Sequence, residues 1–417
     1  MKLLWLCNMT PSCVQEAISG KKGGGLWVDH VLSDLRKKGL DIRILCPGSG
    51  VEGSVDDHCS YAFFAERLPH VYQPELETRY EKELSAFHPD VIHVWGTEYG
   101  HTLAMVNAAE RAGLLDKLVI SIQGLCSVYA GHYAEGVPHN VQQGYTFRDL
   151  VKQDNIRQQQ EKFVLRGILE VEALSKAKHV IGRTDWDKAC AEKINPKCRY
   201  HFCNETLREA FYEGTWDYTT CQKHRIFASN CVYPIKGFHY LLEAFAQVRK
   251  TYPDATLAVP GGSFLSPDTK GKLRQSGYQK YMRSLALKYH LEDHIEFLGY
   301  LGPEQMKQQF LSANVFVLPS TIENSPNSLG EGMLLGVPCV SSLSGGVATM
   351  MEHNKEGFIY QSTAPYMLAH YVNKVFSMEE KAENLGAAAK IHAEKTHAPD
   401  TNLNRLLEIY EELANCS

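Results

Sequence analysis

Short apolar segments alternate with longer amphipathic segments along the first half of the chain. The apolar segments are KLLWLCN, LDIRILCP, DVIHVWG, KLVISIQG and HVIGRT, and helical patterns such as GLWVDHVLSDLRKKG and a stretch beginning near His101 separate them. Strands rich in Val, Ile and Leu that alternate with helices are typical of a parallel sheet covered by helices on both faces. This half of the sequence predicts a Rossmann-like domain.

The same alternation begins again after the polar stretch CNETLREAFYEGTWDYTTCQKHR. Further strands are predicted at RIFASN, TLAVPGG, HIEFLGY, VFVLPS, PCVSS and GFIYQ, with a helix at GFHYLLEAFAQVRK. The predicted fold class is therefore α/β, with two Rossmann-like domains that face each other across a cleft. Open α/β sheets bind ligands at the carboxyl ends of their strands, so we expect the site to lie between the two domains. We expect a first domain at 1–204, a second at 205–390, and a C-terminal helix at 391–417 that packs back on the first domain.

Length and composition agree with a two-domain enzyme. The 417 residues suit two domains of about 200 residues each. A formal charge of −5 argues against a nucleic-acid partner. The N-terminal MKLLWLCN is too short for a signal peptide and is interpreted as a first strand. The twelve cysteines contain no CxxC pair, which favours reduced thiols and a cytoplasmic location.

Two glutamates bracket a predicted helix start in TIENSPNSLGEGMLL. Pro326 fixes its own φ and disfavours helical geometry at the residue before it, so the helix cannot begin before Asn327. Glu323 then belongs to a loop and Glu331 to the first helical turn, with Asn327 or Ser328 as the cap. The free amides and positive dipole end of such a helix suit a phosphate.

Four landmarks occur in order along the chain: GKKGGGLW after the first strand, CNE between the domains, YPIKG before a helix, and ENSPNSLGE with a Glu-x7-Glu spacing. With these landmarks the chain resembles a GT-B glycosyltransferase of family 4, a large retaining family that uses nucleotide-activated sugars. The resemblance spans nearly the whole chain and implies the site residues that follow.

The resemblance implies two catalytic residues in the second domain. Glu323 would orient the donor sugar and stabilise positive charge at the anomeric carbon, and Lys236 would stabilise the leaving diphosphate. Glu331 would bind the donor ribose, since a carboxylate can accept hydrogen bonds from two hydroxyls. The remaining donor-binding residues expected in this domain are Asn327, Ser328, Leu329 and Asn230.

Two positions depart from the family pattern. An arginine usually precedes the lysine, but here Asn230 and Cys231 occupy the segment, and Arg225 lies too early in its strand to substitute. A histidine near the sugar is replaced by Gln123, followed by Gly124. Glutamine can hydrogen-bond a hydroxyl but cannot act as a general base.

Other candidates lie in the first domain. Gly24 and Gly25 would let the backbone approach the donor phosphates or the acceptor, although a flexible turn explains them equally well. Gln123, Gly124 and Glu98 are candidates for the acceptor or sugar site. Asp185 and Asp187 match a DxD metal motif, but capping of a helix is the simpler explanation. We expect no metal and no cofactor, with the nucleotide sugar as substrate.

Residues 147–180, taken as one helix, would place basic side chains on one face beside Phe163. These basic residues are Arg148, Lys152, Lys162 and Arg166. The face could rest on anionic lipid, or it could be a solvated face balanced by Asp149, Asp154 and Glu161, and Asp154-Asn155 could break the helix. Similar bacterial enzymes build surface polysaccharides on polyprenyl-diphosphate lipids, so we expect salt-sensitive attachment to the inner face of the plasma membrane.

Taken together, the residues and the resemblance predict a retaining hexosyl- or N-acetylhexosaminyltransferase. Its donor would be a nucleotide diphosphate sugar, with UDP favoured by its frequency in the family, and its acceptor a glycan linked to lipid. Two alternatives remain open. One is a GT-B-like nucleotide-sugar epimerase. The other is an inactive donor-binding partner subunit, which is considered because the arginine that usually binds the donor phosphates is missing.

Overall fold

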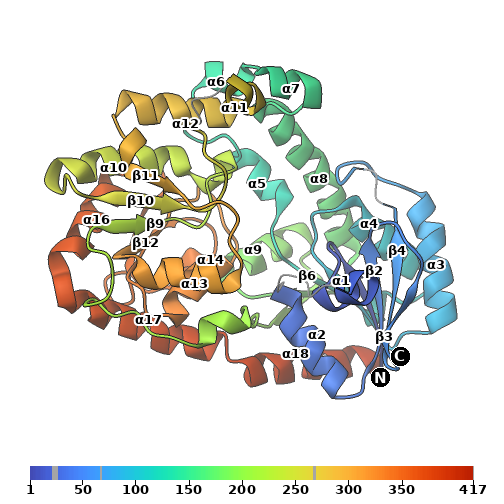
Figure 1. Ribbon diagram of the computed structural model, residues 1–417. Coiled ribbons are helices and arrows are strands. Elements are labelled where there is room, and N and C mark those ends of the chain that lie inside the picture. The colour runs from blue at the N-terminus through green and yellow to red at the C-terminus, as the bar shows by residue number, and fades with distance from the viewer. Residues whose placement is uncertain (21–26, 66–67, 266–268, 417) are drawn as a thin grey trace. The chain divides into compact units, whose positions relative to one another are not determined.

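The computed structural model describes residues 1–20, 27–65, 68–265 and 269–416, which divide into two compact units (Figure 1). The first unit comprises residues 1–130, 162–208 and 396–417, and the second comprises residues 131–161 and 209–395. Residues 131–161 therefore group with the second unit although they precede the expected boundary near residue 204.

An eight-stranded sheet forms the centre of the first unit, with the strand order β3-β4-β2-β1-β5-β6-β7-β8. All described neighbours are parallel except β3 and β4, which pair antiparallel. The sequence pattern did not predict β3 or β4. The strands are β1 (Lys2–Cys7), β2 (Asp41–Pro47), β3 (Gly53–Asp56), β4 (Cys59–Phe64), β5 (Val91–Trp95), β6 (Leu118–Ser121), β7 (His179–Gly182) and β8 (Arg199–Phe202).

Helices cover both faces of this sheet, so its central strands are buried on two sides. In β5, Ile92 and Val94 belong to one apolar cluster, while Val91 and Trp95 belong to the other. This arrangement confirms the prediction of a parallel sheet between two helical layers. The helices around it are α1 (Ser12–Ser19), α2 (Trp27–Lys37), α3 (Glu75–Phe87), α4 (Gly100–Arg111), α5 (Cys126–His132), α8 (Ile156–Lys176), α9 (Asp185–Ile194) and α18 (Pro399–Ala414).

The last helix, α18, packs on the sheet of the first unit, as predicted. Trp5 Nε1 donates to the hydroxyl oxygen of Tyr410 (3.2 Å), and that hydroxyl also lies 2.5 Å from His93 Nδ1. Burial lowers the pKa of His93 to about 3, so its imidazole is neutral. His93 is thus a core histidine that joins β5 to α18.

A six-stranded, all-parallel sheet forms the centre of the second unit, with the order β11-β10-β9-β12-β13-β14. The six runs that the sequence pattern assigned to strands in this half each overlap one of them. The strands are β9 (Arg225–Phe227), β10 (Thr256–Val259), β11 (Ile295–Phe297), β12 (Val315–Leu318), β13 (Cys339–Leu343) and β14 (Phe358–Gln361).

Helices and short 3-10 turns surround this second sheet. The 3-10 turn η3 (Pro234–Lys236) leads directly into α10. The α-helices are α6 (His139–Gln143), α7 (Phe147–Lys152), α10 (Phe238–Thr251), α11 (Thr269–Arg274), α12 (Gly277–Lys288), α13 (Pro303–Ser312), α14 (Asn327–Leu334), α15 (Val347–Met350), α16 (Pro365–Met378) and α17 (Ala382–Thr396).

Residues 147–180 do not form one helix, and the chain breaks near Asp154-Asn155, the break that the sequence left open. α7 ends at Lys152, Gln153 takes a left-handed conformation with φ of 47°, and α8 begins at Ile156. Arg148 pairs with Asp149 and Asp154. A continuous basic face is therefore not formed. In the described parts of the chain, each helix is too short or too polar to cross a lipid bilayer.

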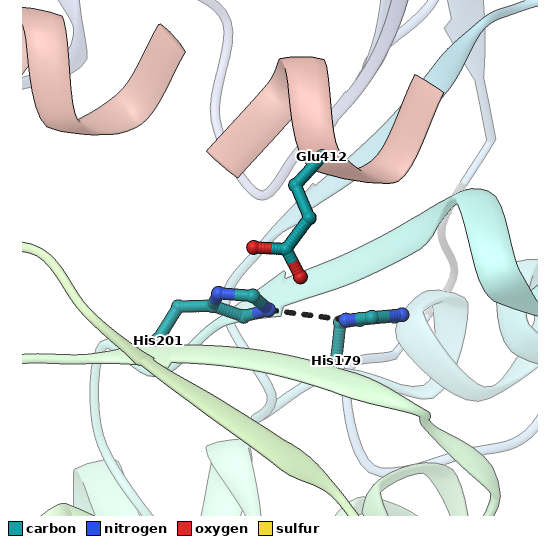
Figure 2. Close-up of side chains that lie close together, drawn as sticks. All are labelled: His179, His201 and Glu412. Atoms are coloured by element: carbon teal, nitrogen blue, oxygen red, sulfur yellow. Dashed lines mark hydrogen bonds between the residues drawn. The ribbon is translucent and has the colours of Figure 1, made fainter. Parts of the chain in front are cut away.

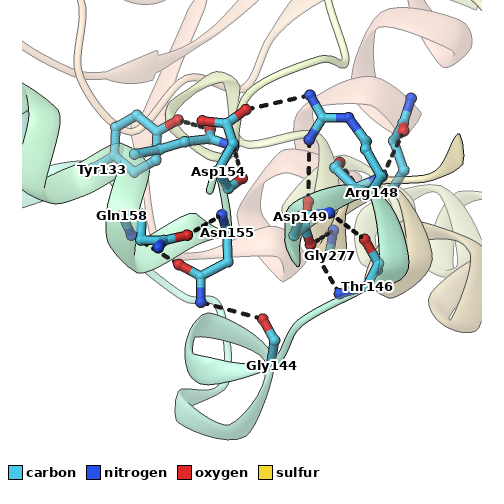
Figure 3. A network of polar contacts seen from close by, with 12 residues as sticks. Tyr133, Gly144, Thr146, Arg148, Asp149, Asp154, Asn155, Gln158 and Gly277 are labelled. Carbon is cyan, nitrogen blue, oxygen red and sulfur yellow. Dashed lines mark hydrogen bonds and ion pairs between the residues drawn. The ribbon is translucent and has the colours of Figure 1, made fainter. Parts of the chain in front are cut away.

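A buried carboxylate explains why α7 folds with the second unit. Asp149 is fully buried, and its Oδ2 accepts from the backbone N–H groups of Thr146 (3.2 Å) and Gly277 (2.8 Å). Its other oxygen accepts from Arg148, and Thr146 in turn caps α7 (Figure 3). Because Gly277 is the first residue of α12, Asp149 joins the starts of two helices that are distant in sequence.

We predict that Asp149→Asn weakens the contact between α7 and α12. An amide has only one oxygen, so it can accept either from the backbone N–H groups of Thr146 and Gly277 or from Arg148, but not from both sets. The free energy of local unfolding around this contact should fall by about 1–3 kcal/mol. Hydrogen exchange should become faster in α7 and in the first turn of α12. The control is Asp154→Asn, which removes a partly exposed partner of Arg148. Equal exchange in the two variants would contradict the role of Asp149.

Candidate active site

The candidate donor side lies at one edge of the second sheet. β9 and β12 are parallel neighbours, so their carboxyl ends lie side by side. The chain after β9 leads to Lys236 in η3, and the chain after β12 leads to Glu323 in the loop before α14. The fold thus brings together two residues that the sequence assigned to catalysis.

Lys236 and Glu323 form an ion pair in which Lys236 Nζ lies 2.6 Å from Glu323 Oε1. Ser320 Oγ donates to the same carboxylate oxygen at 2.7 Å. The Glu323 side chain is 9 % exposed and that of Lys236 is 27 % exposed. The carboxylate is therefore held inside the unit, while the lysine side chain is partly exposed.

Backbone contacts hold the two loops against each other. Thr321 N donates to the carbonyl oxygen of Ile235 at 2.9 Å. Gly237 has a φ of 63°, and a Cβ at this position would lie 1.9 Å from the carbonyl oxygen of Pro319. A glycine after Lys236 is thus required both by its left-handed backbone and by this close approach.

The start of α14 differs in detail from the prediction. The helix begins at Asn327, as Pro326 required, but Pro326 itself occupies the N-cap position instead of Asn327 or Ser328. Leu329 N donates to the Pro326 carbonyl oxygen at 2.9 Å, so this amide is already used. Glu331 is buried and is the fifth residue of the helix, which places it in the second turn, not the first.

The structure also shows what replaces the expected arginine. Asn230 accepts a hydrogen bond from Val232 N (2.8 Å), so its side-chain oxygen stabilises its own turn. Arg225 is the first residue of β9, is buried, and pairs with Glu296 (2.7 Å). It lies at the opposite end of the strand from Lys236, as the sequence indicated.

In the first unit, Gln123 belongs to a polar triangle in which Arg183 is buried and Gln123 and Glu205 are partly buried. Its Nε2 donates to Glu205 Oε1 at 2.6 Å, and its Oε1 accepts from Arg183 at 3.0 Å. Arg183 also pairs directly with Glu205. Arg183 Nε and Glu205 Oε2 are buried and have no hydrogen-bond partner among the residues that the structure describes.

A pocket at the carboxyl ends of β5 to β8 contains two members of this triangle, Arg183 and Glu205. Leu403 and Leu406 of α18 form part of its apolar wall. A pocket with an apolar wall and a few convergent polar groups is the usual form of a small-molecule site. Neither Arg183 nor the buried pairing of Glu205 was predicted, although Glu205 belongs to the CNE landmark.

The loop that carries Gln123 and Gly124 is anchored by a residue that sequence analysis missed. Glu170 of α8 accepts from the backbone N–H groups of Cys126 (3.0 Å) and Ser127 (2.9 Å), at the start of α5. Thr97 Oγ1 lies 2.7 Å from both Glu170 Oε2 and the Gly124 carbonyl oxygen. A glutamate within a long amphipathic helix gives no local signal of this role.

Glu98 lies next to this anchored loop and has a strongly perturbed pKa. Burial is the largest cause, and it raises the pKa of Glu98 to about 7 despite the opposing charge of Arg166. Arg166 donates to the Glu98 carbonyl oxygen at 2.6 Å. Perturbed carboxyl groups of this kind cluster at functional sites.

Two further sets of candidates can be placed. Gly24 and Gly25 lie outside the described residues. The Asp-Trp-Asp segment opens α9, where Thr184 and Asp187 form a capping box and Asp187 also accepts from Tyr200 (2.6 Å). The predicted capping role of this segment is therefore confirmed.

Comparison with known proteins adds to this geometry. Residues 222–392 match the family Glycosyl transferases group 1. The chain is 28 % identical over 182 residues to the putative glycosyltransferase YtcC of Bacillus subtilis, an alignment that covers 43 % of each protein. It is 28 % identical over 130 residues to the putative colanic acid biosynthesis glycosyltransferase WcaL of Escherichia coli, covering 30 % of this chain and 29 % of WcaL.

The whole chain is similar in structure to HepE of Anabaena, crystallised in complex with UDP and glucose. The TM-score is 0.68 at 17 % identity, and the match covers 99 % of each chain. This similarity shows a GT-B fold, and the family match supports a glycosyltransferase. The chain spans less than half the length of the first curated relatives that it matches.

We predict that Glu98→Gln makes the protein more stable at alkaline pH. Because the native carboxyl group holds a proton that the unfolded chain releases, wild-type stability falls as pH rises from about 4.5 to 7. Glutamine stays neutral, so this loss disappears. The melting temperature of the variant relative to wild type should rise by roughly 2–6 °C between pH 5 and pH 8.

The control for this measurement is Glu16→Gln, which changes an exposed glutamate of the same unit. The difference between its melting temperature and that of wild type should be independent of pH. A Glu98→Gln difference that is equally flat would contradict the raised pKa.

Proposed function

We propose that this chain is a retaining, metal-independent glycosyltransferase of family 4. It would transfer a hexose or an N-acetylhexosamine from a UDP sugar to a glycan acceptor. The observation that carries the proposal is the ion pair of Lys236 and Glu323 at the carboxyl edge of the second sheet, within the segment that matches the glycosyltransferase family.

In this reaction the bond between the anomeric carbon and the diphosphate oxygen breaks, and negative charge develops on the leaving diphosphate. Lys236, the more exposed partner of the pair, would turn to the diphosphate and stabilise that charge. Glu323 would stay in place through Ser320 and accept hydrogen bonds from the sugar. The amides of Asn327 and Ser328 at the open end of α14 would supply further donors.

Glu331 would bind the ribose of the donor. Its carboxylate on α14 can accept hydrogen bonds from two neighbouring hydroxyl groups. In a retaining transfer, the acceptor hydroxyl would attack the face of the sugar from which the diphosphate leaves. Its proton would pass to the leaving phosphate oxygen, because Gln123 cannot act as a base.

The acceptor side would be formed by Gln123, Gly124 and Glu98 and by the adjoining pocket of the first unit. Support for UDP comes from the structural similarity to HepE, and support for polysaccharide synthesis from the similarity to WcaL. We therefore propose a glycan acceptor carried on a polyprenyl diphosphate.

Incubation of the purified protein with radiolabelled nucleotide sugars tests this function against its alternatives. Slow release of free sugar, or transfer to an added glycan, is expected of a transferase. An epimeric nucleotide sugar would indicate the epimerase. Donor binding without any product would indicate the inactive subunit, which is favoured by the use of Asn230 within its own turn.

We predict distinct effects for three substitutions on the donor side. Glu331→Ala should weaken binding of UDP, whereas Glu323→Ala should lower turnover more than UDP affinity. Lys236→Ala should lower the transfer rate about 10²-fold or more, the usual scale for loss of an organised charge partner. Calorimetry with UDP and initial-rate measurements separate binding from turnover.

The matched control is Lys250→Ala, which removes an exposed lysine at the end of α10. It should keep the wild-type rate. Unchanged UDP affinity in Glu331→Ala would reject its ribose role, and a wild-type rate in Lys236→Ala would reject the role of the ion pair.

We also propose peripheral attachment to an anionic membrane, by a surface other than the expected basic face. α7 exposes Phe147, Leu150 and Val151 with 64 %, 62 % and 69 % of their surface accessible, beside the exposed Lys152. Apolar side chains next to a lysine suit insertion at the boundary of lipid headgroups. Arg166 would not contribute, because it is bound to the Glu98 carbonyl.

We predict that replacing Phe147, Leu150 and Val151 together by serine reduces cosedimentation with anionic vesicles at least fivefold, since about 25 cal/mol is lost per Å² of apolar surface not buried. The control is Ile391→Ser, an equally exposed apolar residue of the same unit. Wild-type protein that stays in the supernatant at low salt would rule out the attachment.

A further inference from the structure

A polar cluster lies under α18 in the first unit, among apolar side chains of the sheet and the helix. It consists of His179 on β7, His201 on β8 and Glu412 on α18 (Figure 2). Around it, Ile181, Cys203, Ile409 and Leu413 belong to one apolar core. Buried polar side chains in such surroundings are costly unless each finds a partner.

Strand register brings the two histidines together. His179 pairs with Arg199 and Ile181 pairs with His201 across the parallel strands. Residues two apart on a strand share a face, so His179 and His201 are diagonal neighbours on the face that α18 covers. Both imidazoles are buried.

The imidazole nitrogens face each other. His179 Nδ1 lies 3.0 Å from His201 Nε2, so one nitrogen carries the shared hydrogen and the other offers a lone pair. The carboxylate of Glu412 points toward the space between the two rings (Figure 2). One ligand atom from each of the three residues lies within 4.8 Å of the others.

From this geometry we infer that His179, His201 and Glu412 form a binding site for a divalent transition metal ion of the zinc class. Ligand atoms about 2.1 Å from a tetrahedral zinc ion are about 3.4 Å apart, so small side-chain rotations would close the site. Each ring can present a lone pair by carrying its hydrogen on the outer nitrogen. Water would fill the fourth position.

The ligand set favours this class over other cations. Two imidazoles and one carboxylate suit zinc and its neighbours, whereas magnesium and calcium prefer oxygen ligands throughout. The Glu412 side chain is 29 % exposed, which leaves a path for the ion from solvent. Arg199 pairs with Glu412, so the metal would share this carboxylate with the guanidinium or displace it.

The site would stabilise structure without taking part in sugar transfer. His179 is the first residue of β7, at the amino edge of the sheet, whereas the candidate acceptor pocket lies at the carboxyl edge. A bound ion would tie the end of α18 to β7 and β8. The inference does not rest on the proposed function, and removal of metal should leave glycosyl transfer unchanged.

The experiment uses the full chain, stripped with EDTA and then titrated with Zn²⁺ against a chromogenic chelator. One Zn²⁺ per chain with micromolar or tighter affinity is expected, together with a rise in melting temperature. Co²⁺ should give the intense visible absorption of a tetrahedral site. Glu412→Gln should weaken Zn²⁺ binding about 10–100-fold, and a His179→Gln/His201→Gln double variant should abolish it.

Glu408→Gln is the matched control, because Glu408 lies one turn earlier on α18 and is exposed. It should bind Zn²⁺ as tightly as wild type. The fold should tolerate Glu412→Gln, because the Glu412 side chain is partly exposed. Lack of a stoichiometric site in wild type would overturn the inference. So would a site that persists in the double histidine variant or responds equally to Glu408→Gln.

Discussion

Adjacent parallel strands end at the same edge of a sheet, and the donor side depends on this constraint. Because β9 and β12 are neighbours, the segments that follow them meet, and Lys236 reaches Glu323 across 87 residues of sequence. Gly237 and Thr321 then fix the separation of the two segments through backbone contacts. The order of the strands therefore places the two residues side by side. Gly237 lets the segment after Lys236 approach the backbone of Pro319.

The first unit uses the same edge in a different way. Gln123 and Glu205 follow β6 and β8, and Arg183 follows β7, so three neighbouring strands each contribute one member of the polar triangle. Glu170 of α8 holds the loop after Gly124 by binding the start of α5. Charges that are buried and mutually paired keep these side chains in fixed positions before any ligand arrives.

Several buried carboxylates hold the start of a helix through hydrogen bonds to backbone amides. Asp149 joins the starts of α7 and α12, Glu170 holds the start of α5, and Asp187 closes the start of α9. In each case a carboxylate accepts from backbone amides at a helix N-terminus, where the dipole favours negative charge.

The sequence by itself determined most strands, both sheet-and-helix halves, the start of α14 at Asn327 and the capping of α9. These features follow from local rules, namely the period of apolar residues and the restricted backbone around proline. Tertiary structure alone decided the short strands β3 and β4 and the grouping of Lys236, Ser320 and Glu323. It also decided which carboxylates are buried, because partners of Asp149 and Glu170 lie far away in the chain. Local rules act on a few consecutive residues, whereas such contacts exist only after the sheets have set the order of their strands.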